Sequence, residues 1–139
     1  MKHFTALVVL FLAACTLPVP DDGNEFLAVA TAALPQIERG QPSVKYLVEP
    51  SLDPRVRLAL AKLRTVVDRS EVPQVAGISL PRGYIVIQQF KLSADEALVQ
   101  GQGGPVIAGN RMSCGYYATV PLKRIAGQWV AEQVPVTVC

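Results

Sequence analysis

The sequence predicts an α+β domain in which two helices pack on one face of a curved, mainly antiparallel sheet of four to five strands. Two patterns predict this fold class. Apolar residues recur at helical spacing in two stretches of the first half of the chain, whereas runs rich in β-branched residues, separated by turn residues, fill the second half. The chain is long enough for one domain with a single core, which we place at residues 24–139.

The first helix is expected to begin at Asn24, which can cap it, and Glu25 in the first turn is favourable to the helix dipole. Its apolar face comprises Phe26, Leu27, Ala30, Ala33 and Leu34. Pro35 is expected to kink or end this helix because proline has no amide hydrogen to donate. Whether Pro35 kinks the helix or ends it, residues 39–42 are expected not to be helical. A short strand is expected at residues 44–48.

The second helix begins with Asp53 as its cap and Pro54 at the first helical position. Its apolar stripe comprises Val56, Ala59, Leu60, Leu63, Val66 and Val67. Basic residues flank the stripe, with Arg55, Lys62 and Arg69 on one side and Arg57 and Arg64 on the other. Two interpretations fit these residues: basic side chains that lie along the edges of a packed helix, or a cationic surface for anionic headgroups or an acidic partner.

Residues 70–83 contain two prolines and two glycines and are expected to form a loop with at most a short strand inside. A strand follows at residues 84–92, then a turn at 93–96 and an antiparallel strand at 97–102. The glycine-rich segment 101–105 is interpreted as a bend between strands. A phosphate-binding loop is the alternative, but it requires a following helix or a Gly-Lys-Ser/Thr ending, and the sequence has neither.

The last two strands are expected at residues 115–124 and 128–138, joined by a two-residue turn. Such a turn would place Cys114 opposite Cys139, close enough for a disulfide. The apolar residues of the two strands would then point to opposite faces, so we expect a bulge near residues 132–135, which offsets the cysteines by one position. We still expect the bond, whose loop of about 26 residues would contribute about 3–4 kcal/mol.

The segment from residue 97 onward, with Leu122-Lys123-Arg124 and Gly127-Gln128-Trp129-Val130, resembles the sheet half of NTF2-like or cystatin-like domains, in which a final hairpin often carries a glycine-x-tryptophan turn. The resemblance implies a sheet wrapped around a helix, sometimes with a pocket between them, and it assigns no functional residues. Candidates for the wall of a pocket are Tyr84, Tyr116 and Trp129. Packing in the core or on the sheet is the alternative for these aromatic side chains.

The start of the chain has the layout of a secretory signal, with Lys2, an apolar run at residues 6–13 and small residues before Cys15. The run is shorter than the about 20 residues that a membrane-spanning helix needs. Leu12-Ala13-Ala14-Cys15 resembles the lipobox of bacterial lipoproteins. The resemblance implies cleavage before Cys15 and acylation of its thiol and of the new amino terminus. The alternative is an ordinary secretory signal in which the cysteine is incidental.

The chain is therefore expected to consist of a signal peptide at residues 1–14, a lipidated Cys15 with a linker to residue 23, and the domain. More than one acyl chain would hold the protein durably in a membrane. Thr16, and not aspartate, follows the cysteine. By the sorting pattern of enterobacterial lipoproteins, this residue favours the outer over the inner membrane. The linker at residues 16–23 spans at most about 28 Å, so the domain should lie close to the membrane, on its periplasmic side.

Composition narrows the classes of function. The mature chain keeps 12 basic residues (13 less Lys2) against 11 acidic ones, so it has no general electrostatic reason to bind nucleic acid. His3, the one histidine, leaves with the signal, which excludes Ser-His-Asp and Cys-His machinery. Cys114 and Cys139 are then the remaining soft ligands for zinc, and in an oxidising compartment they are expected to pair instead. We expect neither a metal site nor a cofactor.

The leading interpretation is a lipid-anchored cell-envelope protein that acts as a non-enzymatic interaction or assembly module, with the membrane and another envelope protein as its partners. A small-ligand binder with a pocket between helix and sheet is the second interpretation. The third is an enzyme that uses carboxylates such as Glu49, Asp95 and Glu132, which fall in separate expected elements.

Overall fold

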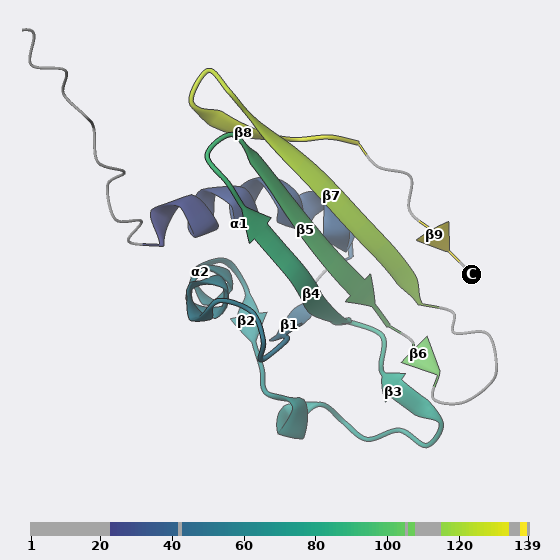
Figure 1. The fold of residues 1–139 in the computed structure, drawn as a ribbon. Helices are drawn as coiled ribbons and strands as arrows, with labels where there is room; N and C mark the ends of the chain where they lie inside the picture. Colours follow the sequence, from purple (N-terminus) through teal and green to yellow (C-terminus); the bar gives the residue numbers. More distant parts are fainter. Residues whose placement is uncertain (1–22, 42, 105, 108–114, 134–136, 139) are drawn as a thin grey trace, which may run out of the picture.

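The computed structural model describes residues 23–41, 43–104, 106–107, 115–133 and 137–138. The predicted α+β class is confirmed, since two helices pack on a curled, mostly antiparallel sheet that forms a half-barrel (Figure 1). The helices are α1 (Asn24–Glu38), α2 (Pro54–Leu63) and the short 3-10 helix η1 (Arg69–Glu71). The strands are β1 (Lys45–Val48), β2 (Thr65–Val66), β3 (Ile78–Leu80), β4 (Tyr84–Leu92), β5 (Glu96–Gly103), β6 (Val106–Ile107), β7 (Tyr116–Ile125), β8 (Gln128–Ala131) and β9 (Thr137–Val138).

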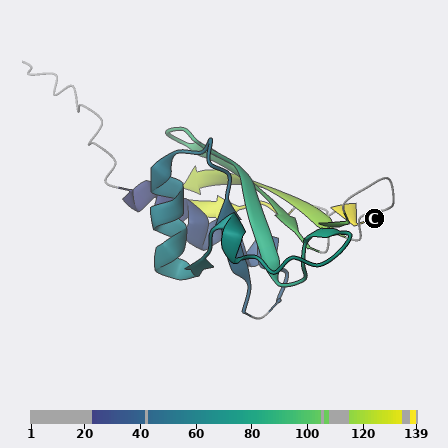
Figure 2. The same ribbon diagram turned by 90° about the horizontal axis from the view of Figure 1, so that it is seen from below.

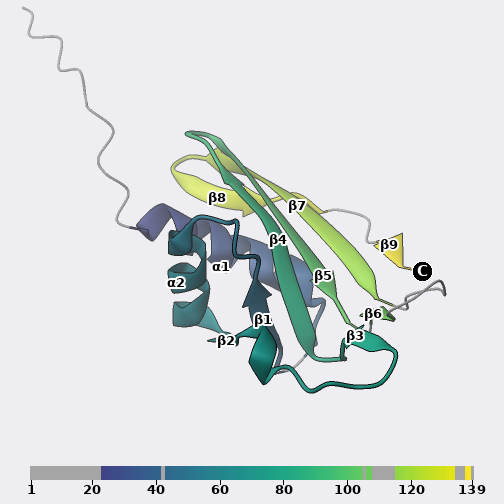
Figure 3. The same cartoon turned by 60° about the horizontal axis from the view of Figure 1, so that its bottom comes forward.

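The sheet has the strand order β2-β1-β4-β5-β7-β8, and β9 also pairs with β7. Strand β1 runs parallel to both β2 and β4, whereas the other pairs of this sheet are antiparallel. Strands β3 and β6 form a small separate sheet. Figure 3 shows α1 behind β4 and β5 and α2 beside β1, and the view from below in Figure 2 shows the curvature of the sheet. The edge strand β2 and the two-residue strand β6 were not predicted from the sequence.

Helix α1 differs from its prediction at both ends. Gly23, in the left-handed conformation, occupies the N-cap and Asn24 is the first helical residue, so the expected asparagine cap is wrong. The helix also continues through Pro35 for another turn instead of ending there. Tertiary contacts explain this continuation, because the last turn buries Ile37 completely and holds Glu38 in a hydrogen-bonded cluster. These contacts compensate for the backbone hydrogen bond that proline cannot make.

Helix α2 starts as predicted and ends earlier. The Asp53 side chain accepts a hydrogen bond from the backbone N–H of Arg55, and Pro54 occupies the first turn. The hydrogen bonds from Arg55 lower the pKa of the Asp53 carboxyl to about 2. The helix ends at Leu63, and Thr65–Val66 pairs with β1, so the part of the expected stripe at residues 66–67 is not helical. Three consecutive β-branched residues at 65–67 favour the extended conformation.

The main core lies between the helices and the concave face of the sheet. Its largest fully buried side chains are Tyr46, Leu34, Ile37, Leu60, Ile85, Ile87 and Leu122. A second, smaller cluster consists of Leu47, Val67, Val72, Leu80 and Val86. Its members on β1 and β4 alternate with residues of the main core, so this cluster lies on the opposite face of the sheet.

Strand β5 continues through part of the glycine-rich segment. Gly101 and Gly103 pair with Ala118 and Tyr116 of β7, so the expected bend at residues 101–105 does not begin before Gly103. A Cβ atom at Gly101 would lie 2.8 Å from Cγ2 of Ile37. The glycines are therefore needed in the strand because the end of α1 and the Tyr116 ring approach its backbone closely.

The predicted geometry of the last hairpin is confirmed where the structure describes it. Ile125 pairs with Gln128 across a two-residue turn, but Tyr116 pairs with Val138, which is one position out of that register. The register therefore changes by one residue between Ala131 and Thr137, while part of the expected bulge at residues 132–135 lies outside the described residues. Cys15, Cys114 and Cys139 lie outside the described residues.

Candidate functional site

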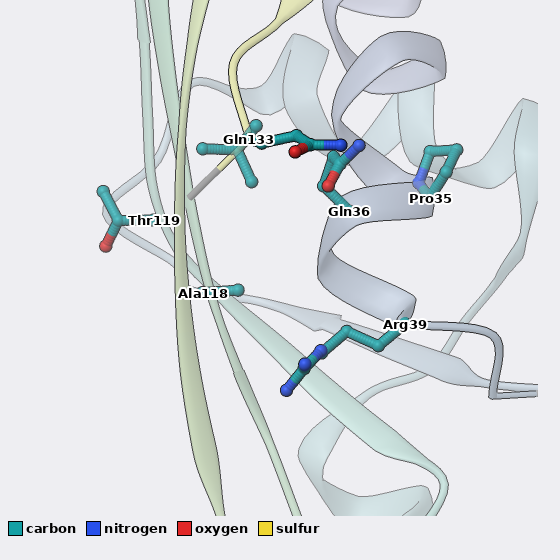
Figure 4. A pocket seen from close by; sticks show the side chains of 7 residues that line it. Pro35, Gln36, Arg39, Ala118, Thr119 and Gln133 are labelled. Atoms are coloured by element: carbon teal, nitrogen blue, oxygen red, sulfur yellow. The ribbon is translucent and has the colours of Figure 1, made fainter. Parts of the chain in front are cut away.

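A groove lies between the C-terminal half of α1 and strand β7, and it is the candidate site that we describe in detail. Its volume is about 390 Å³, within the range of ligand-binding sites. It is lined by Pro35, Gln36, Arg39, Ala118, Thr119, Val120 and Gln133 (Figure 4). We call it the α1–β7 groove.

The groove lies next to the point where the pairing of β7 with β8 ends, at Leu122 and Ala131. The backbone N–H of Glu132 still donates to the carbonyl of Pro121 at 2.9 Å, and Gln133 then lies above the groove. Ala118 and Val120 are inward-facing, buried positions of β7 and contribute small apolar side chains. In Figure 4 the side chains of Gln36 and Gln133 point toward each other. The site therefore combines two amide side chains with small apolar groups of the strand.

Arg39 supplies the charge of the groove. It follows the last residue of α1 in the left-handed conformation, with φ of 51°, and its backbone N–H donates to the carbonyl of Pro35. From there its side chain extends toward Ala118 (Figure 4). Within the described ranges, no carboxylate forms an ion pair with Arg39, whereas Arg55, Arg57, Arg64 and Arg124 each have one. The groove thus presents an exposed guanidinium group that a ligand can reach.

Tyr116 fixes the end of α1 beside the groove. Its hydroxyl donates a hydrogen bond to the backbone carbonyl of Ile37 at 2.8 Å and accepts one from Nε2 of Gln41 at 3.2 Å. Burial raises the pKa of this phenol, while the positive charge of Arg39 acts in the opposite direction. The strand and the last turn of the helix are therefore held together next to Arg39.

The three predicted pocket-wall aromatics lie in different places. Tyr116 is buried in the main core, Tyr84 packs against the second cluster, and Trp129 donates from Nε1 to the Glu25 carboxylate at 2.8 Å. The structure does not bring them together, and the α1–β7 groove is lined by other residues. Packing of the sheet and hairpin accounts for all three side chains.

The predicted basic surface is interrupted by acidic partners. Arg55 pairs with Asp53 at 2.7 Å, Arg57 with Asp68 at 3.0 Å, and Arg64 with Glu38 at 2.6 Å. In addition, Arg55 lies over the Phe26 ring, Arg69 donates to the carbonyl of Ser79 at 3.4 Å, and Lys62 is exposed. Three of the five basic residues are thus neutralised locally.

The buried residues Glu38 and Tyr46 form a polar cluster with the exposed Arg64 under the end of α1. The Tyr46 hydroxyl donates to Oε1 of Glu38 at 2.8 Å, and the Arg64 guanidinium donates to both carboxylate oxygens, at 2.6 and 3.1 Å. Burial, together with Glu38, raises the pKa of Tyr46, and the same carboxylate raises the pKa of Arg64. All three groups are engaged with one another, so the cluster stabilises the packing of α1, β1 and the end of α2.

The carboxylates of the enzyme hypothesis do not share a site. Glu49 lines a hollow of about 730 Å³ beside α2, and Glu132 lines one of about 420 Å³, where it pairs with Lys123 at 3.4 Å. Asp95 lies exposed in the turn between β4 and β5. In the part of the chain that the structure describes, no three His, Cys, Asp or Glu side chains are arranged to hold a metal ion.

The groove residues Gln36, Arg39 and Gln133 were missed by the sequence interpretation. Arg39 carries a local signal, because a basic residue before glycine at a helix end suits a C-cap. The two glutamines carry none, since 97 positions separate them in the chain and only the fold places them together. A groove built from three distant segments has no spacing that a motif search could find.

Two further findings bear on function. Among residues 23–133 that are described, no helix is long and apolar enough to cross a membrane. Comparison of the chain with protein-family models, curated proteins and solved structures gave no match.

Proposed function

We propose that this chain is a lipid-anchored protein of the bacterial cell envelope whose α+β domain acts as a non-enzymatic binding module close to the membrane. The lipobox-like segment that ends at Cys15 motivates the anchor. The α1–β7 groove is the observation that carries the binding role, because it presents the Arg39 guanidinium and two amide side chains around small apolar groups. The proposed partner is another envelope protein.

The tether would orient the domain. The chain enters α1 at Gly23, and the Glu25 side chain binds Arg124 and Trp129 of the β7–β8 hairpin. This hairpin and the β4–β5 turn lie at the same end of the molecule as the start of α1 (Figure 1). With a linker of at most about 28 Å, that end would face the membrane. The groove lies at the other end of α1, which would present it to a partner on the periplasmic side.

Metabolic labelling with palmitate tests the anchor. We expect label in the wild-type protein and none in Cys15→Ser. Cys114→Ser and Cys139→Ser are matched controls that should keep the label, since neither residue belongs to the lipobox-like segment. Equal labelling of the wild type and Cys15→Ser would overturn the anchor.

Photo-crosslinking in cells tests the binding role. A photoreactive amino acid at Gln36 or Gln133 should capture the same envelope protein, because both side chains border the groove. The control position is Leu58, which is 65% exposed on α2 and does not line the groove. If all three positions capture the same abundant proteins, the groove is not the contact surface and the proposal fails.

A small-molecule ligand is the second candidate function, and the volume of the groove, about 390 Å³, favours it. Native mass spectrometry of the protein isolated from its host distinguishes the two. A small ligand would add a constant mass to the wild type that is lost in Arg39→Gln, with no protein adduct in the crosslinking experiment.

A further inference from the structure

We infer that the α1–β7 groove binds a short peptide segment that ends in a free carboxylate, as the C-terminus of the partner envelope protein. This inference deepens the proposed function and rests on the domain being a binding module. In this arrangement, Arg39, Gln36 and Gln133 of the groove contact the C-terminal residues of the partner protein.

The charge of the groove selects an anion. Arg39 is the one charged side chain among the described residues that line it. Four other arginines of this structure each form an ion pair with a carboxylate of the same chain. Arg39 would form the same kind of pair with a carboxylate of the ligand. Arg39 is exposed and has no such partner among the described residues. Two N–H groups of its guanidinium can therefore donate side by side to the two oxygens of a ligand carboxylate.

A carboxylate fits the site better than a phosphate group. Phosphate carries nearly two negative charges at neutral pH, and sites that bind it combine several cations with backbone N–H groups at a helix N-terminus. This groove lies instead at the C-terminal end of α1, where the helix dipole opposes a doubly charged anion more than a singly charged one, and it offers one guanidinium. One negative charge with two coplanar oxygens matches that single donor group.

The amide side chains suit a peptide backbone. Gln36 and Gln133 each offer a donor and an acceptor, and they point toward each other from α1 and from the segment after β8 (Figure 4). A peptide unit between them can satisfy both, since it also carries one donor and one acceptor. Pro35, Ala118 and Val120 form the apolar part of the lining. The two strand residues are almost fully buried, so a small side chain next to the carboxylate would pack mainly on the exposed Pro35.

The test uses the full-length protein in detergent micelles and two probes, acetyl-Ala-Ala-Ala with a free C-terminal carboxylate and the same peptide as its C-terminal amide. Titration calorimetry should give at least tenfold tighter binding of the carboxylate form. In Arg39→Gln this preference should disappear. Arg39→Lys, which keeps the positive charge at the helix end but not the two-point geometry, should retain only part of it.

Arg82→Gln is the matched control, because Arg82 is exposed, has no carboxylate partner in the described segments and does not line the groove. It should bind both peptides as the wild type does. Equal affinity for the two peptides, no binding of either, or an unchanged preference in Arg39→Gln would each overturn the inference. Tighter binding of inorganic phosphate than of the carboxylate peptide would overturn it in favour of a phosphate site.

The crosslinking experiment separates this inference from the proposed function. Capture of an envelope protein from Gln36 with no peptide preference would leave the binding module standing and reject the carboxylate site. Where a partner is captured, removal of its last three residues should abolish the crosslink, and replacement of the same number of residues elsewhere in its tail should not. A crosslink that survives the truncation contradicts the inference.

Discussion

Gly103 of β5 lies directly opposite Tyr116 of β7, and the tyrosine ring covers the glycine so closely that a Cβ atom at position 103 would overlap it. The ring could not move aside without cost, because its hydroxyl is hydrogen-bonded to the end of α1. Gly103→Ala should therefore destabilise the protein by about 1–3 kcal/mol, the usual cost of overpacking a core site. Urea unfolding followed by circular dichroism measures this change.

A double mutant shows whether the ring is the cause. In a Tyr116→Ala background, the added methyl group at position 103 has no ring to displace, so its cost should fall to a small fraction of the wild-type cost. The same cost in both backgrounds would show that the strain comes from the backbone of β5 and not from Tyr116.

The two glycines of β5 also show where prediction from sequence fails. A glycine cluster locally indicates a bend, and the reasons for Gly101 and Gly103 to be in a strand are Ile37 and Tyr116, which are distant in the chain. The same holds for the extension of α1 past Pro35, which depends on tertiary contacts. By contrast, the Asp53 cap, the strand at residues 84–92 and the register of the last hairpin rest on local patterns, and these predictions are confirmed.

The polar cluster of Glu38, Tyr46 and Arg64 under α1 should behave as a coupled unit. Tyr46→Phe removes a hydrogen bond to the charged Glu38 carboxylate and should cost about 1.5–3 kcal/mol of unfolding free energy. Glu38→Gln should also destabilise, because it breaks the ion pair with Arg64. Since the residues share one network, the double mutant should cost less than the sum of the single mutants. Strict additivity in chemical denaturation would contradict the coupling.

Alkaline pH should unfold the protein through its buried tyrosines. Burial raises the pKa values of Tyr46 and Tyr116 above 10.0, so the folded state holds these protons after the unfolded state has begun to lose them. Their contribution to stability is therefore fully present below pH 10 and is lost as the pH rises above it. Phenolate absorbance of wild type minus Tyr46→Phe should appear only together with loss of the circular dichroism signal. Reversible ionisation in the folded protein would contradict this expectation.

The register of the last hairpin bears on the expected bond between Cys114 and Cys139. The pairing of Tyr116 with Val138 places a residue two positions after Cys114 opposite the residue before Cys139, although the cysteines lie outside the described residues. Peptide mapping without reduction should recover the two cysteine peptides as one linked species. Cys114→Ser should lower the unfolding free energy by about 3–4 kcal/mol. Alkylation of both thiols in unreduced, denatured protein would exclude the bond.

The β7–β8 hairpin is held against the start of α1 by one carboxylate. Glu25 pairs with Arg124 and accepts a hydrogen bond from the indole of Trp129, whose ring centroid lies 4.8 Å from the Arg124 guanidinium carbon. Both partners come from the hairpin, so loss of the carboxylate should loosen the hairpin at the end of the domain that we propose faces the membrane.

Glu25→Ala tests this contact. The fluorescent reporter is Trp129, the one tryptophan of the chain. Its fluorescence should shift to longer wavelength, and the unfolding free energy should fall by about 1–2 kcal/mol, since two hydrogen-bonded groups lose a charged acceptor. Glu132→Ala is the matched control beside the same hairpin, where the exposed ion pair with Lys123 at 3.4 Å should contribute at most about 1 kcal/mol. If the two variants lose the same stability and leave the fluorescence unchanged, Glu25 does not hold the hairpin, and its contacts with Arg124 and Trp129 contribute no more than an ordinary surface ion pair.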